Sequence, residues 1–221
     1  MTTLRTNVLS FIFIAIPVAV TIYLYPSLPE QIPTHWNIAG EVDDYTPKPW
    51  GVLILPMAAM FVFLIMKLIP VISPKGFRTD QFQGVINIFT VTIVGFMSAI
   101  ALVVLLAATG RDVHVNELVF AGVGLLFIVL GNYLGKVRKN FFIGIRTPWT
   151  LASDEVWSRT HRLGGWVFVL IGFFLFLNVF IPFPEAWLIG AIVVVALVPV
   201  VYSFVIYRNL EGFEEEGPDT D

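Results

Sequence analysis

The sequence alternates long apolar runs with short polar segments, and this alternation predicts the fold. Six runs contain no Asp, Glu, Lys, Arg or His: residues 6–29, 49–66, 81–110, 118–135, 163–184 and 186–207. The shortest, 49–66 and 118–135, have 18 residues each. A helix of that length rises about 27 Å, close to the hydrocarbon core of about 30 Å. The pattern therefore predicts an all-α integral membrane protein with six transmembrane helices in residues 1–207.

Composition supports this class. Of 221 residues, 57% are hydrophobic and 13% charged, whereas a soluble domain has about 45 to 50% apolar residues. The first run follows Arg5 as a secretory signal would, but Tyr23 and Tyr25 fit an interfacial belt and nothing like Ala-x-Ala follows Leu24. We therefore interpret it as a span. The absence of cysteine excludes disulfides and thiol chemistry.

Basic residues predict the orientation, because Lys and Arg near span ends are retained in the cytoplasm. Two, Lys48 and Arg111, lie in the loops predicted to be outside, 26–49 and 110–117. The eleven others lie on the side of the chain ends, which includes the inner loops 70–80 and 135–162: Arg5, Lys67, Lys75, Arg78, Lys136, Arg138, Lys139, Arg146, Arg159, Arg162 and Arg208. Both termini are thus predicted to be cytoplasmic. The acidic end, 208–221, is too polar to fold alone and is expected to be a disordered tail.

The outer loop 26–49 contains five prolines and a turn-rich stretch from Asn37 to Gly40. This composition disfavours helix and favours an ordered hairpin-like or irregular cap. Its aromatic and polar residues allow two compatible interpretations. They could anchor the loop at the headgroups and form its turns, or present an aromatic anchor and acidic groups to a cationic peptide.

A dense polar and aromatic segment, 140–165, lies between the fourth and fifth apolar runs. Ser153 is a natural N-cap, with Asp154 and Glu155 in the first turn, so a helix should begin there and either run on to Ile181 or kink at Gly164 and Gly165. Topology alone needs only the basic residues here. Gly144 permits an unusual backbone, and Arg146 can pair with Asp154 or Glu155. We expect specific recognition or a structural latch.

Other function classes are less well supported. No ionisable residue falls in the middle of a span, which argues against a pump. Asn87, Asn132 and Asn178 could bond between helices or line the path of a small-molecule transporter or channel, which is the main alternative.

An enzyme is least favoured, because neither face assembles a catalytic set and no His-Glu-x-x-His occurs. An outer metal site would need two loops to bring together His35, Asp43, Asp44, His114 and Glu117. We therefore expect no catalytic residue, no metal and no cofactor.

Two motifs together resemble the SdpI family. Asn140-Phe-Phe-Ile-Gly-Ile-Arg-Thr-Pro-Trp-Thr-Leu151, with Trp157, His161 and Gly164-Gly165, is similar to the family hallmark. Pro33-x-His-Trp-Asn-x-x-Gly-x-x-Asp-x-Tyr45 is similar to a domain of unknown function common in its N-terminal half. The resemblance implies a multi-pass protein of a prokaryotic plasma membrane that gives immunity to a secreted peptide toxin. In the best-known member, the toxin-engaged protein also captures a cytoplasmic transcriptional repressor.

These arguments assign two sets of candidate residues and no direct contact with nucleic acid. The toxin-facing set is His35, Trp36, Asn37, Gly40, Asp43 and Tyr45. The set for a cytoplasmic partner is Asn140, Gly144, Arg146, Thr147, Pro148, Trp149, Asp154, Trp157, Arg159 and His161.

Overall fold

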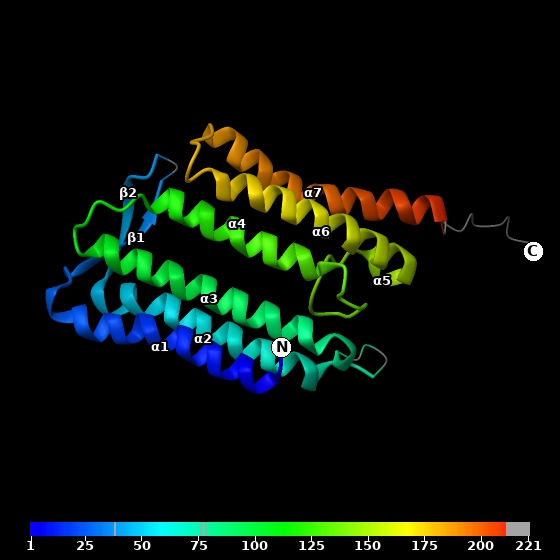
Figure 1. Cartoon of the computed structure of the whole chain (residues 1–221), viewed down its shortest axis with the longest axis horizontal. Helices are drawn as coiled ribbons and strands as arrows, with labels where there is room; N and C mark the ends of the chain where they lie inside the picture. The colour runs from blue at the N-terminus through cyan, green and yellow to red at the C-terminus, as the bar shows by residue number, and fades with distance from the viewer. Residues whose placement is uncertain (38, 76, 78, 211–221) are drawn as a thin grey trace, which may run out of the picture.

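Six long helices form the body of the protein, which the computed structural model describes at residues 1–37, 39–75, 77 and 79–210. They are α1 (Thr3–Leu24), α2 (Lys48–Ile72), α3 (Gln83–Ala108), α4 (Val115–Leu134), α6 (Asp154–Leu177) and α7 (Glu185–Leu210) (Figure 1). All six are long and apolar enough to cross a membrane. Large apolar side chains such as Phe61, Val71 and Leu170 remain exposed on their outer faces, where lipid replaces water as the solvent. The predicted fold class is confirmed.

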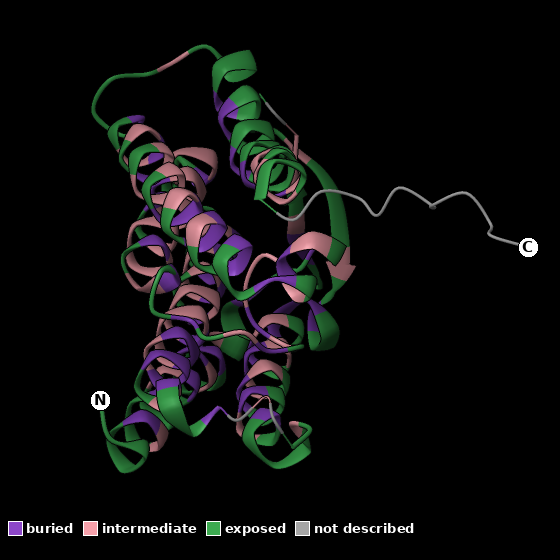
Figure 2. Cartoon of the chain, turned by 90° about the vertical axis from the view of Figure 1, so that its right-hand side faces the viewer, coloured by how far each residue is buried: buried purple, intermediate pink, exposed green. Residues whose placement is uncertain are grey.

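The helices form two groups. In the first, α3 packs against α1 and α2; in the second, α6 packs against α4 and α7, and contacts between α3 and α4 join the groups. Buried residues lie on the helix faces that meet inside the bundle, and exposed residues lie on the outer faces (Figure 2). The first group has its own apolar core around Phe63 and Val94, and the second has one around Leu175 and Leu188. Each half of the chain therefore contributes one packed group.

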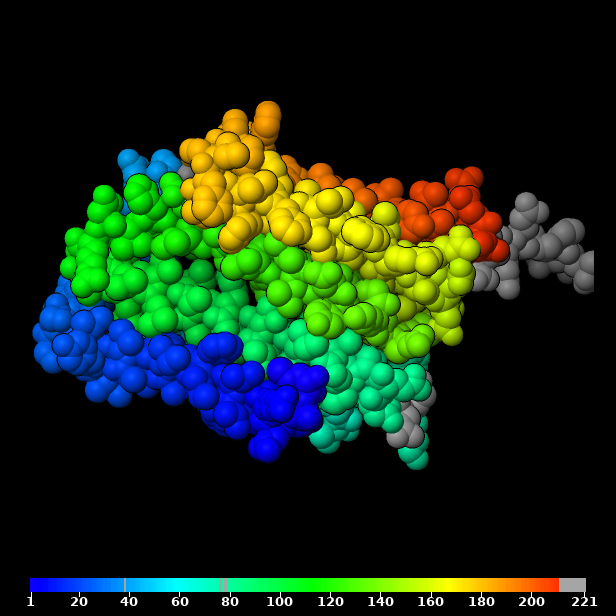
Figure 3. All heavy atoms as spheres, in the orientation of Figure 1, coloured from blue at the N-terminus to red at the C-terminus, as the bar shows by residue number. Residues whose placement is uncertain are grey.

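The bundle has two different ends. At one, which we call the terminal end, lie residues 1–5, 73–75, 77, 79–82, 135–153 and 208–210. The end of α7 extends further there than the start of α1 (Figure 3). The other, the hairpin end, consists of residues 25–37, 39–47, 109–114 and 178–184. The start of α1 and the end of α7 thus belong to the same end of the bundle, as an even number of spans requires.

An antiparallel hairpin caps the hairpin end. Strand β1 (Gln31–Trp36) follows a 3-10 turn, η1 (Tyr25–Ser27), and pairs with β2 (Val42–Pro47). Ile32 is fully buried against α2, where a Cβ added to Gly51 would lie 2.7 Å from the Cβ of Ile32. The hairpin is thus seated directly on the start of α2. We predicted an ordered cap that was either hairpin-like or irregular, and the structure has the hairpin.

Glycines allow α4 and α6 to touch through their backbones. A Cβ at Gly131 would lie 2.7 Å from the carbonyl oxygen of Gly165, and one at Gly124 would lie 2.6 Å from that of Gly172. In the same way, a Cβ at Gly165 would lie 2.7 Å from the carbonyl oxygen of Gly131, and one at Gly172 would lie 2.6 Å from that of Gly124. Small residues are the usual means of close helix contact in membranes. Sequence analysis missed this crossing, although both pairs of glycines have the same spacing of seven residues.

The helix at Ser153 begins as predicted: the Ser153 hydroxyl accepts a hydrogen bond from the Val156 N–H at 3.4 Å. It continues through Gly164 and Gly165 without a break, so they mark the crossing with α4 rather than a helix end. It ends at Leu177, not Ile181, because the Asn178 side chain accepts from the Phe183 N–H at 2.9 Å and forms a turn.

The predicted inner loop and tail contain further helical residues. The inner loop 135–162 contains a short helix, α5 (Pro148–Ala152), and the first turns of α6, while a 3-10 turn, η2 (Asp80–Phe82), precedes α3. In the predicted tail 208–221, Arg208 to Leu210 belong to α7. Residues 211–221 lie outside the described residues.

Candidate functional site

The motif segment, residues 136–153, is organised first by Asn140, which is fully buried. Its amide nitrogen donates to the carbonyl oxygens of Arg138 and Ile143, at 2.8 and 2.9 Å. Its carbonyl oxygen accepts from the N–H groups of Phe142 and Ile143, at 2.8 and 2.7 Å. One side chain thus satisfies four backbone groups of an irregular turn, of which the N–H and carbonyl of Ile143 are buried and would be costly to leave unpaired.

His161 of α6 holds the next part of the motif segment. Its Nε2 accepts from the Ile145 N–H at 3.0 Å, and its Nδ1 lies 2.8 Å from the carbonyl oxygen of Trp157. The ring is therefore neutral, with its proton on Nδ1. Gly144 has a φ of +116°, and a Cβ there would lie 2.3 Å from His161 Nε2. Only glycine lets the backbone approach the ring this closely.

Trp157 completes this contact. Its ring stacks on His161 with centroids 4.0 Å apart, and its indole N–H donates to the Val137 carbonyl at 2.8 Å. Only 3% of the residue is exposed. Trp157 belongs to a core with Phe82 and Ile86, so α6 and the start of α3 both pack against the motif segment.

The C-terminal part of the motif segment is attached to α7. Thr147 caps α5 in a reciprocal pair with Thr150, each side chain bonding to the other's backbone N–H. The Thr147 hydroxyl also lies 3.0 Å from that of Ser203 on α7. Pro148 opens α5, and the Trp149 ring meets Phe204 edge-on at 5.0 Å. Sequence analysis did not select Thr150, although Thr-x-x-Thr before a helix is a capping signal.

The predicted pairing of Arg146 with Asp154 or Glu155 is wrong. Arg146 is exposed and donates to the carbonyl of Phe141. Asp154 pairs with Lys139 at 2.5 Å, and Glu155 pairs with Arg159 at 2.5 Å. Each carboxylate thus pairs with a basic residue other than Arg146. Arg159 lies one helical turn from Glu155, a spacing at which opposite charges on a helix interact.

The structure thus divides the predicted partner-binding set. Asn140, Thr147, Trp157 and His161 are buried and hold the motif segment in place. Their contacts are those of a structural latch. The exposed members are Arg146, Pro148 and Asp154, with Arg159 and Trp149 half-buried.

At the hairpin end the candidate residues point the other way. His35 Nδ1 lies 2.5 Å from an Asp43 oxygen across the hairpin, and both side chains are largely exposed. Asn37 receives the Glu41 N–H on its side-chain oxygen at 3.0 Å and forms the turn that Gly40 closes. Tyr45 is 53% exposed.

Trp36 is half-buried and turns inward. Together with His35 it lines an apolar hollow of about 300 Å³, whose other walls are residues of α2, α3 and α4, among them Ile54 and Val104. A second hollow of about 300 Å³ adjoins it and is lined by Gly40 and the carboxylates of Asp112, Glu117 and Glu185. Sequence analysis did not select Asn116, which lines both hollows and donates to the Asn37 carbonyl at 3.0 Å, fixing the hairpin to α4.

The three asparagines of the transporter alternative lie apart. Asn87 donates to the Met1 carbonyl at 3.1 Å, Asn132 bonds to Ile128 of its own helix, and Asn178 closes the turn after α6. Asn132 lines a hollow between α4 and α6, and Asn178 lines a different one at the hairpin end. Across the described residues, no three His, Asp or Glu side chains form a group that could hold a metal ion.

Comparison with known proteins places both motifs. The model of the SdpI/YfhL protein family matches residues 136–203, and that of a domain of unknown function (DUF1648) matches residues 12–60. The immunity protein SdpI of Bacillus subtilis (strain 168) is 27% identical over 213 residues, which cover 95% of this chain and 99% of that protein. No solved structure matches the chain. Both motifs therefore occur in matching order: residues 136–203 match the SdpI/YfhL family model, residues 12–60 match the DUF1648 model, and the similarity to that immunity protein extends over nearly the full length of both chains.

Proposed function

We propose that this protein is a membrane immunity protein that protects its cell from a secreted peptide toxin, which it meets at the hairpin end. The observation that carries this proposal is the apolar hollow beneath Trp36, which opens beside an acidic surface. The apolar hollow can accept an apolar side chain, and the carboxylates beside it attract basic side chains. A cationic amphipathic peptide carries both kinds of side chain. The similarity to an immunity protein supports the same function.

Charge favours that class of peptide. The hairpin end and the helix starts beside it carry seven carboxylates against two basic residues, Lys48 and Arg111. The carboxylates are Glu30, Glu41, Asp43, Asp44, Asp112, Glu117 and Glu185. Lys48 is buried, with its ammonium bonded to the Leu28 carbonyl at 2.9 Å and 3.6 Å from Glu30. The surface open to a ligand is therefore strongly negative, which accelerates encounter with a cationic peptide at low ionic strength.

The test is survival of a toxin-sensitive bacterium that expresses the full chain. We expect Asp43→Asn with Asp44→Asn, and separately Val119→Phe to fill the apolar hollow, to reduce protection at unchanged membrane abundance. Glu155→Gln, an exposed carboxylate at the terminal end, is the matched control and should protect fully. Full protection by both hairpin-end variants would contradict the site; no protection by the unaltered, inserted chain would contradict immunity itself.

We further propose that toxin binding lets the terminal end capture a cytoplasmic transcriptional repressor. Burial restricts direct contact to the accessible residues of the motif segment and α6, chiefly the exposed Arg146 and the half-buried Arg159. Arg146→Ala with Arg159→Ala should abolish membrane recruitment of a tagged repressor in toxin-treated cells, whereas Arg5→Ala should not. Unchanged recruitment in the double variant would contradict this step while leaving protection untouched.

The proposal also requires the hairpin to face outward, as the distribution of basic residues predicts. Because the chain has no cysteine, a single introduced one reports its own location. Ala39→Cys should react with a membrane-impermeant maleimide in intact cells, and Ala152→Cys only after permeabilisation. The opposite result would place the acidic surface inside and exclude it as the toxin site.

A further inference from the structure

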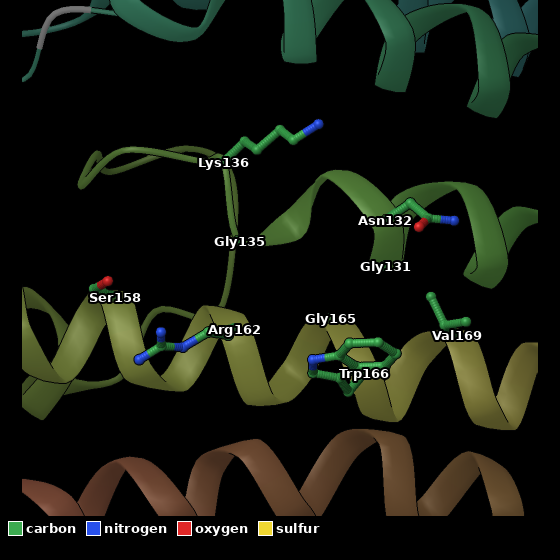
Figure 4. A pocket seen from close by; sticks show the side chains of 9 residues that line it. All are labelled: Gly131, Asn132, Gly135, Lys136, Ser158, Arg162, Gly165, Trp166 and Val169. Carbon is green, nitrogen blue, oxygen red and sulfur yellow. The ribbon is translucent and has the colours of Figure 1, made fainter.

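A hollow of about 390 Å³ lies in the groove between α4 and α6, and nothing in the proposed immunity mechanism uses it. Figure 4 shows the residues that line it: Gly131, Asn132, Gly135, Lys136, Ser158, Arg162, Gly165, Trp166 and Val169. Two of them are basic and none is acidic. Its inner wall contains Gly131 and Gly165, the glycines of the helix crossing, whose lack of side chains leaves the groove open.

The hollow lies at the level where apolar spans end. Lys136 directly follows the charge-free run 118–135, and Arg162 directly precedes the run 163–184. Trp166, one helical turn beyond Arg162 on α6, is 65% exposed. Tryptophan is enriched at the boundary between hydrocarbon and headgroups, and basic residues beside it face the phosphates. The polar half of the hollow therefore lies at headgroup depth and the half near Val169 at acyl-chain depth.

The two cations of the hollow are available to a ligand. Their neighbours Lys139 and Arg159 are paired with Asp154 and Glu155, but Arg162 has no ion pair within the described part of the chain. The Lys136 ammonium lies over the Tyr133 ring at 4.7 Å, a contact that leaves all three N–H donors free of carboxylates. Arg162 extends along α6 towards Ser158 (Figure 4), so its guanidinium and a hydroxyl lie on the same side.

We propose that this hollow binds the phosphodiester headgroup of an anionic phospholipid. The guanidinium of Arg162 offers paired N–H donors that match two phosphate oxygens, Ser158 adds a hydroxyl, and the flexible Lys136 supplies a second charge. One acyl chain then lies along Trp166 and Val169. A second hollow of about 370 Å³ on the other side of Arg162 and Trp166 is lined also by Arg159 and by Tyr202 of α7, and adds polar space at headgroup depth. Free phosphate would leave the apolar half of the first hollow, near Val169, unfilled.

The test uses the purified full chain in neutral detergent, with bound lipid counted by native mass spectrometry. It is titrated separately with dioleoylphosphatidylglycerol, dioleoylphosphatidylcholine and inorganic phosphate. Lys136→Gln with Arg162→Gln should weaken retention of phosphatidylglycerol about thirtyfold, because each basic residue near an anionic headgroup contributes about a fivefold factor. Arg5→Gln with Lys67→Gln removes the same charge from α1 and α2 and should change retention little.

A charge-preserving variant separates a built site from diffuse attraction. Gly135 has helical backbone angles, and a Cβ there would lie at an ordinary 3.7 Å from Arg162 Cα, so Gly135→Leu should fold and fill the hollow. The proposal is supported if phosphatidylglycerol is lost from Gly135→Leu and from Lys136→Gln with Arg162→Gln, but is retained by Arg5→Gln with Lys67→Gln. Equal loss in both charge variants, full retention in Gly135→Leu, equal binding of phosphatidylcholine, or displacement by inorganic phosphate would each overturn it.

Discussion

The motif segment and the hairpin are both dense in polar and aromatic residues, yet they direct those residues in opposite ways. Asn140 of the motif segment is fully buried, as is His161 of α6, which holds the segment, whereas Tyr45 and the His35–Asp43 pair of the hairpin are exposed. The motif segment therefore chiefly stabilises the fold, whereas the hairpin chiefly presents side chains for contact with a ligand. A polar segment kept out of the bilayer can serve either purpose, and only its contacts distinguish the two.

The difference follows from what surrounds each segment. The motif segment lies against α6, α7 and the start of α3, so its irregular backbone is enclosed and needs internal partners. In the hairpin, strand pairing satisfies the backbone hydrogen-bonding groups, and one face packs against α2 and α3. Its outward side chains are left free. Substitutions in the motif segment should therefore reduce stability and protection together, and those in the hairpin should reduce protection alone.

The largest effect is expected from Gly144→Ala. The added Cβ would overlap His161 Nε2 at 2.3 Å and the residue would keep a φ of +116°, which is strained for alanine. Strain and overpacking together should lower the free energy of unfolding by about 3 to 5 kcal/mol. Thermal unfolding in detergent measures this loss. Gly190→Ala on α7, where a Cβ meets nothing within 4 Å, is the control and should be neutral or slightly stabilising. Equal stability of the two variants would refute the close approach of Gly144 to His161.

A smaller effect is expected from His161→Phe. Phenylalanine keeps a ring beside Trp157 but cannot accept from the Ile145 N–H, which is left buried without a partner. The expected loss is about 2 to 3 kcal/mol in the free energy of unfolding. His161→Gln can place an amide oxygen near the position of Nε2 and should recover part of it. If Phe and Gln variants unfold alike, the hydrogen bond to Ile145 does not stabilise the segment.

Much of this arrangement was accessible from the sequence. Charge-free runs gave the six spans, Ser153 with two following carboxylates gave the start of α6, and prolines with Asn37 and Gly40 gave the hairpin-like cap. These features depend on local composition and on the length of a bilayer crossing. They needed no knowledge of which helices touch.

The orientation of the motif side chains was not accessible, because it depends on partners far away in the sequence. The Thr147 hydroxyl lies beside that of Ser203, and the Trp157 indole donates to the Val137 carbonyl. Asp154 forms its ion pair with Lys139 rather than with Arg146. The spacing of four residues between Trp157 and His161 puts both on one face of a helix, but it cannot show that the chain's own loop covers this face. Residues that bind a partner and residues that hold a loop in place therefore cannot be told apart from the sequence.

Trp157→Phe tests the latch with a milder change. The ring remains, while the indole N–H that donates to the Val137 carbonyl is lost. One buried acceptor without its donor should cost about 1 to 2 kcal/mol of unfolding free energy. Trp187→Phe, at an exposed position on α7, controls for the loss of an indole from a membrane helix. A Trp157→Phe variant as stable as this control would show that the contact with Val137 is dispensable.

The smallest effect on stability is expected from His35→Ala with Asp43→Asn, and it is the most informative for the comparison. Both groups are largely exposed, and a pair of this kind contributes about 1 kcal/mol or less. The hairpin should persist, because Ile32 stays buried and Thr34 still bonds to Thr46 at 2.8 Å. Thermal unfolding should therefore match the unaltered chain while toxin survival falls. If unfolding shifts as far as in His161→Phe, the hairpin is itself a stabilising element and the division between cohesion and contact fails; if survival is unchanged, the toxin meets another surface.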